Sequence, residues 1–97
     1  MPHAIVAWSV TTPDAHEDLR ACLDGRSWVR PLDQLYVVRL RGEREHAELV
    51  EDLKAVARSR RGQVRLLVGP LIEGGHYSGW LRTDLWEGIA RRTEEEP

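Results

Sequence analysis

The 97-residue sequence contains no phenylalanine, a single cysteine, a single methionine and no long apolar run. Because Cys22 is alone, an internal disulfide and a zinc site built from several cysteines are excluded. No apolar stretch approaches the roughly 20 residues that a membrane-spanning helix needs. The opening stretch, MPHAIVAW, also lacks the basic and long apolar regions of a secretory signal, so we expect a cytoplasmic protein.

The sequence also lacks an excess of one kind of charge, because its 14 basic and 16 acidic residues leave a net charge of -2. This balance argues against a generally basic nucleic-acid-binding protein. The charges are clustered, however, with positive charge in RSRRGQVR, residues 58–65, and negative charge in the final TEEEP. The length suits one domain. We expect this domain to span residues 1–90, followed by a disordered acidic tail over residues 91–97.

The spacing of the apolar residues predicts the order strand, helix, strand, strand, helix, strand, followed by a short appended piece. Thr12 can cap the first helix and Pro13 suits its first turn. The expected elements are a strand over 4–10, a helix from Thr12 to Gly25, a hairpin of 27–32 and 35–41, a helix over 44–61, strand segments over about 63–68 and 71–73, and a short helix near Thr83.

This order predicts an α+β fold, specifically a ferredoxin-like βαββαβ sandwich with two helices on one face of an antiparallel sheet. The unbroken apolar stretches AIVAW and LYVVRL suit the two central strands. Pro31 lacks a backbone donor, which predicts that the second strand lies at an edge. An extra C-terminal strand and a short helix extend the sandwich.

The pattern Trp28, Leu32, Tyr36, Val38, followed by VRLLV and a closing GWL, resembles the small SinR-like proteins. These are relatives of the CRISPR-associated Cas-two and VapD endoribonucleases. The likeness implies a homodimer of ferredoxin-like subunits, in which the strand over 71–73 adds to the sheet of the partner. The chain also has more apolar residues than a thin sandwich readily buries, which favours a dimer. We expect the dimer interface to contain Leu71, Ile72, Trp80 and Trp86.

The nuclease members of that group carry an aspartate at the tip of the first strand, where it holds a divalent metal ion. The corresponding position in this chain is Ser9, after Trp8. Serine cannot supply a negatively charged oxygen ligand to Mg²⁺. An active metal-dependent endoribonuclease would therefore have to use Asp14 or Asp33 with Mg²⁺ or Mn²⁺, and no other cofactor is expected.

The four histidines show no paired spacing, so we expect surface histidines and no metal site. The loop GGHYSG is the exception, because His76 and Tyr77 supply an acid-base group and a phenol between glycines. This loop suggests an alternative class, a dimeric α+β-barrel enzyme or binding protein for a small molecule. The weak catalytic candidates are therefore Ser9, Asp14, Asp33 and His76.

Arginines concentrate at the end of the second predicted helix and along the third strand. They complement the negative end of a helix, or they contact nucleic-acid phosphates. Arg39 and Arg41 would extend such a surface for single-stranded RNA if they shared a sheet face with Trp28 or Tyr36. The predicted nucleic-acid-binding residues are Arg39, Arg41, Arg58, Arg60, Arg61 and Arg65.

The leading hypothesis is a homodimer, non-catalytic or weakly catalytic, that binds RNA or DNA through these arginines or a protein partner through its sheet edge and C-terminal segment. A metal-dependent endoribonuclease and a small-molecule protein are the two alternatives.

Overall fold

The computed structural model describes residues 2–74 and 77–93. They fold into one antiparallel sheet with three helices, which confirms the predicted α+β class. The elements are β1 (Pro2–Val10), α1 (Pro13–Ala21), β2 (Trp28–Leu32), β3 (Leu35–Arg39), α2 (Glu43–Ser59), β4 (Val64–Val68), β5 (Ile72–Glu73) and α3 (Thr83–Thr93).

The strands lie in the order β2-β3-β1-β4, so β1 and β3 take the central positions that their apolar sequences predicted. β2 lies at one edge, where the missing N–H of Pro31 is tolerated, and β4 lies at the other. Thr12 caps α1 as expected, because its Oγ1 accepts a hydrogen bond from the Ala15 N–H at 3.2 Å.

β5 continues along β1 beyond the Gly69-Pro70 break and pairs Ile72 with His3 of its own chain. The sequence analysis instead expected residues 71–73 to add to the sheet of a partner. Gly69 explains how the chain stays against β1, since its N–H donates to the Ile5 carbonyl at 2.8 Å.

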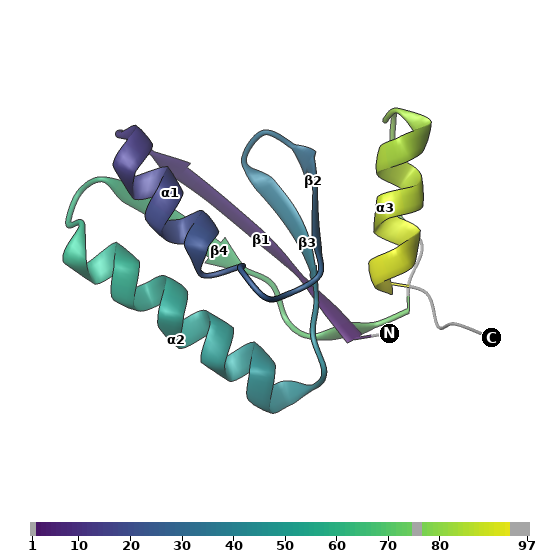
Figure 1. The fold of residues 1–97 in the computed structure, drawn as a ribbon, viewed down its shortest axis with the longest axis horizontal. Helices are drawn as coiled ribbons and strands as arrows, with labels where there is room; N and C mark the ends of the chain where they lie inside the picture. Colours follow the sequence, from purple (N-terminus) through teal and green to yellow (C-terminus); the bar gives the residue numbers. More distant parts are fainter. Residues whose placement is uncertain (1, 75–76, 94–97) are drawn as a thin grey trace.

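The core lies between the sheet and the pair α1 and α2, which run side by side over one face (Figure 1). Side chains of a strand alternate between the two faces of the sheet. Residues Ala4, Val6 and Trp8 of β1 point into this core and are at most 3% exposed. Trp8 stacks on Tyr36 with ring centroids 4.5 Å apart, and Trp28 meets Tyr36 edge-on at 5.4 Å.

The opposite side of the sheet is called the second face below, and it carries Ile5, Ala7 and Ser9 of β1. α3 covers its β2 end (Figure 1), and buried Gly88 makes this approach possible. A Cβ atom at Gly88 would lie 2.8 Å from Cγ2 of Val29, closer than two carbon atoms can pack. α3 does not cover the β4 end of the second face, where Leu67 is 73% exposed.

α3 reaches beyond the position at which the tail was expected to begin. The helix continues to Thr93, past the predicted domain end at residue 90, because the buried Thr93 hydroxyl donates to the Ile89 carbonyl at 3.0 Å. The rest of the predicted tail, residues 94–97, lies outside the described residues. Within the described part of the chain, no helix is long and apolar enough to cross a membrane.

Tyr36 offers a stability test, because its buried hydroxyl has no hydrogen-bond partner among the described residues. A buried polar group left unpaired costs about 1–3 kcal/mol. We expect Tyr36→Phe to keep the aromatic stack and to raise the free energy of unfolding by about 1 kcal/mol in urea denaturation. Tyr77→Phe is the control, since it removes a hydroxyl that is bonded to His3 and should not stabilise the protein. A destabilised Tyr36→Phe protein would contradict this reading.

Candidate nucleic-acid interface

The tip of β1 places a hydroxyl next to a guanidinium group. Ser9 lies directly opposite Arg65 in the antiparallel pairing of β1 with β4, and both residues are exposed. Ser9 follows Trp8, which points into the core, so Ser9 and its neighbour Arg65 lie on the second face. The position that the family resemblance associates with a metal-binding carboxylate therefore holds a serine beside a positive charge.

A shallow hollow of ≈ 320 Å³ surrounds this pair. The turn between β2 and β3 forms one wall, because the Gln34 carbonyl accepts a hydrogen bond from the Trp8 N–H at 3.0 Å. The Ser9 hydroxyl and the Arg65 guanidinium group are donors that suit an anionic oxygen such as a phosphate, while the rest of the lining is mostly apolar. The lining residues are Ala7, Trp8, Ser9, Gln34, Arg65, Leu66 and Leu67.

Further cations lie at the C-terminal end of α2, just before β4 begins and on the opposite side of the sheet from the Ser9–Arg65 pair. Lys54, Arg58 and Arg61 are exposed and line a second shallow hollow together with Ala57. Arg58 makes only a loose contact of 3.9 Å with Glu51. Among the described residues, Lys54, Arg61 and Arg65 have no ion-pair partner, which leaves their charges available to an anionic ligand.

Arg60 has a different role from its neighbours. Its Nε lies 2.7 Å from Oδ2 of Asp18, so this arginine connects α2 to α1. Arg60 was expected among the phosphate-binding arginines, but its guanidinium group is already engaged within the fold.

Arg39 and Arg41 do not join this surface. Arg39 follows Val38, which points into the core beside Trp28 and Tyr36, so Arg39 does not share a face with these aromatic residues and that expectation is wrong. Arg39 lies on the second face opposite His3, at the other end of β1 from Ser9. Arg41 lies just before α2 and pairs with Glu45 at 2.8 Å, which raises the pKa of Arg41. The 17-residue α2 separates the two groups of arginines by about 25 Å.

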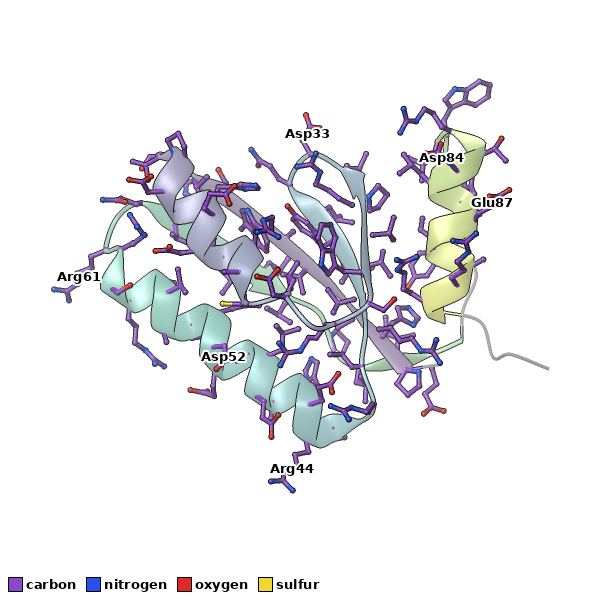
Figure 2. The ribbon with its side chains drawn as sticks, viewed as in Figure 1. Asp33, Arg44, Asp52, Arg61, Asp84 and Glu87 are labelled. Carbon is purple, nitrogen blue, oxygen red and sulfur yellow. The ribbon has the colours of Figure 1, made fainter. Side chains whose placement is uncertain are left out.

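Figure 2 shows this separation directly, because the labelled Arg44 and Arg61 project from opposite ends of α2. Arg44 lies 3.4 Å from Glu48, so the arginines at the start of the helix have acidic partners, whereas Lys54 and Arg61 toward its end have none among the described residues. The two ends therefore differ in available charge although both contain arginines.

The carboxylates that the nuclease hypothesis requires lie apart in exposed positions. Asp14 belongs to the first turn of α1, and Asp33 projects outward from the turn between β2 and β3 (Figure 2). Within residues 2–74 and 77–93, no three histidine, cysteine, aspartate or glutamate side chains gather where they could hold a metal ion.

The histidines correct a further expectation. His3 is fully buried and not at the surface, because Tyr77 covers it and the Tyr77 hydroxyl forms a hydrogen bond with its Nε2. His16 accepts a hydrogen bond from Nε1 of Trp8 at 3.2 Å, and His46 bonds the Gly69 carbonyl oxygen at 2.9 Å. The remaining histidine, His76, lies outside the described residues.

A groove of ≈ 380 Å³ lies between the second face and α3, and Tyr77 forms part of its wall. Burial raises the pKa of the Tyr77 phenol, so its hydroxyl stays protonated beyond its ordinary range. The other lining residues are almost all apolar: Ile5, Pro31, Leu32, Leu35, Val37, Ser78, Gly79, Trp80, Leu81, Trp86 and Ile89.

The four residues expected at a dimer interface fall in different places. Trp80 is 99% exposed at the mouth of this groove, and Trp86 is half-buried inside it. Ile72 is half-buried in β5, and Leu71 packs against the core beneath the helices. The structure therefore does not gather them into one patch on a single chain.

Sequence reasoning missed Lys54, Gln34 and Leu67 at the candidate interface. Lys54 could have been found, because Arg58 and Arg61 follow it by four and seven residues and thus share its side of a helix. Gln34 and Leu67 depend on which strands pair, which local sequence does not specify. Comparison of the chain with protein-family models, with curated proteins and with solved structures found no match.

The single thiol provides a test of the local environment beside α2. Burial raises the pKa of Cys22, and the Asp52 carboxylate raises it further. Because only the thiolate reacts, we expect iodoacetamide to modify folded protein more slowly than urea-unfolded protein at about pH 8. The folding stability linked to this raised pKa is present at lower pH and decreases as the pH rises through the folded-state value. The modification is measured over time by mass spectrometry. Equal rates in the folded and the unfolded state would contradict a raised pKa of Cys22 in the folded protein.

Proposed function

We propose that the protein is a non-catalytic homodimer of the SinR-like, VapD and Cas-two-like type, with ferredoxin-like subunits, that binds nucleic acid. The observation that carries the proposal is the Ser9–Arg65 pair at the tip of β1. A carboxylate at this position would attract a metal cation, whereas a hydroxyl beside a guanidinium group attracts a phosphate oxygen.

Phosphate contacts account for most of the binding in this proposal. Arg65 and Ser9 hold one phosphate on the second face, and Arg61, Arg58 and Lys54 provide a separate group of phosphate contacts at the end of α2, on the core side of the sheet. Trp8 and Tyr36 are buried and stacked on each other, and the half-buried Trp28 packs edge-on against Tyr36, so these rings do not form an open platform for bases. Binding through phosphates alone is independent of base sequence and depends strongly on salt.

A matched pair of substitutions tests the proposal. Arg61→Gln and Arg44→Gln change the net charge equally, but at opposite ends of α2 (Figure 2). We expect Arg61→Gln to weaken binding of a fluorescent oligouridine in an anisotropy titration and to reduce the slope of log affinity against log salt by about 0.7. Arg44→Gln should leave that slope unchanged because Glu48 already contacts Arg44.

Arg65→Gln should lower the slope in the same way as Arg61→Gln. Equal effects of all three substitutions would mean that only net charge matters, and the proposed interface would then be wrong. Cleavage of the oligonucleotide during the titration would contradict the non-catalytic part of the proposal.

A second candidate function is favoured by the groove beneath α3. Its walls are apolar and carry one phenol, Tyr77, which is the arrangement expected of a small-molecule site. The proposed ligand is a small apolar molecule with a single polar group that can reach the Tyr77 hydroxyl.

Filling the groove tests this second function. We expect anilinonaphthalene sulfonate to bind the wild-type protein with a rise in fluorescence, and Leu35→Trp to abolish this rise by occupying the groove. Leu67→Trp is the control, because this exposed side chain lies outside the groove. Unchanged dye binding by the Leu35→Trp protein would exclude the groove as the binding site.

A further inference from the structure

β4 forms an edge of the sheet whose outer side pairs with no described strand. The hydrogen bonds just before and just after β4 show which of its backbone groups already bond to β1. The Thr11 N–H donates to the Gln63 carbonyl, and the Gly69 N–H donates to the Ile5 carbonyl. In an antiparallel pair such bonding alternates along the strand, so Arg65 and Leu67 direct their backbone groups toward β1. The N–H and C=O groups of Val64, Leu66 and Val68 therefore point outward.

This edge carries one exposed charge, Arg65, but β4 contains no proline, bulge or inward-pointing charge. Proline, an inward-pointing charge or a bulge usually protects an exposed edge, as Pro31 does in β2 at the opposite edge. β4 reads VRLLV, with regular pairing to β1 along its whole length. A groove of ≈ 550 Å³ lies beside it, and its lining is apolar apart from His46 and Lys54. The other lining residues are Val50, Ala57, Leu66, Val68, Gly69 and Pro70.

A second β4 strand fits this edge in one register especially well. When two antiparallel copies are centred on Leu66, Val64 lies opposite Val68 of the second copy and Arg65 lies opposite its Leu67. All five residues then pair, and the outward groups form roughly six backbone hydrogen bonds. Sliding one copy by two residues along the other gives a register centred on Arg65. The two Arg65 side chains then lie directly opposite each other, which is unfavourable because they carry like charges.

We propose that two copies of the protein associate through β4, in antiparallel register centred on Leu66, to form one continuous sheet. This proposal rests on the homodimer and phosphate site proposed above, and it names the interface that joins them. The two-fold axis is perpendicular to the sheet, so both second faces point the same way. Arg65 of the second copy lies diagonally across the axis from the first Arg65, within roughly 7–8 Å, and adds its charge to the same anionic ligand.

The substitution Leu67→Arg tests the register. Leu67 is 73% exposed, so a single chain tolerates the change, but in the proposed dimer the new guanidinium group lies opposite Arg65. We expect the dimer dissociation constant to rise by roughly tenfold in sedimentation velocity runs over a dilution series. Leu32→Arg is the matched control, because Leu32 is also exposed but lies on β2 at the far edge, and it should leave the constant unchanged.

A charge exchange makes the test specific to this register. In the double variant Arg65→Glu with Leu67→Arg, each glutamate lies opposite an arginine of the second copy, so we expect dimerisation to recover. Hydrogen exchange gives an independent readout, since the amides of Val64, Leu66 and Val68 should gain protection as the concentration rises. The amides of Arg65 and Leu67 already bond to β1 and should not change.

Several results would overturn the proposal. These are a wild-type protein that stays monomeric at every concentration, a dimer that Leu32→Arg dissociates while Leu67→Arg does not, and failure of the double variant to recover. A β4 edge that gains protection only when an unrelated strand-forming peptide is added would also overturn it. Arg61→Gln removes a proposed phosphate contact outside β4, so it weakens nucleic-acid binding without changing this interface, and loss of either one is distinguishable from loss of the other.

Discussion

The antiparallel pairing of β1 with both β3 and β4 is the constraint on which the rest of the structure depends. Because side chains alternate along β1, this register sends Ala4, Val6 and Trp8 into the core and Ser9 to the second face. A shift of one residue would bury Ser9 and expose Trp8. The same register places Arg65 opposite Ser9, so core packing and the chemistry of the candidate interface are determined together.

The distribution of charge matters more than its sum in this protein. The net charge of -2 suggests little attraction for nucleic acid, yet the structure sorts the arginines by their partners. Glutamates contact Arg41 and Arg44 at the start of α2, and Asp18 contacts Arg60. Arg61 and Arg65 have no such partner among the described residues, so a local positive surface exists on an acidic chain. In salt, the electrostatic field of a charge acts over only a short distance. Attraction of an anionic ligand therefore depends on the charges close to the binding surface more than on the net charge.

The sequence was sufficient to predict the elements and their class, because those depend on local signals. The Thr12-Pro13 helix start, the hairpin around Asp33-Gln34 and the Gly69-Pro70 break are each encoded by a few adjacent residues. Positions that depend on tertiary contact were harder. His3 was expected at the surface, and its burial follows from Tyr77, which is 74 residues away in the chain. Arg60 could not be separated from Arg61 without knowing that Asp18 lies beside it.

The candidate site illustrates the same limit more sharply. Ser9 and Arg65 were both singled out from the sequence, but for unrelated reasons, and only strand pairing brings them together. β4 then has two functions in the proposed dimer. Its second-face residue Arg65 serves the phosphate site, while its outward backbone groups join a second copy. Because both depend on the short strand VRLLV, dimerisation and ligand binding are expected to be coupled: a phosphate chain that contacts Arg65 of both copies favours the paired state, by linkage.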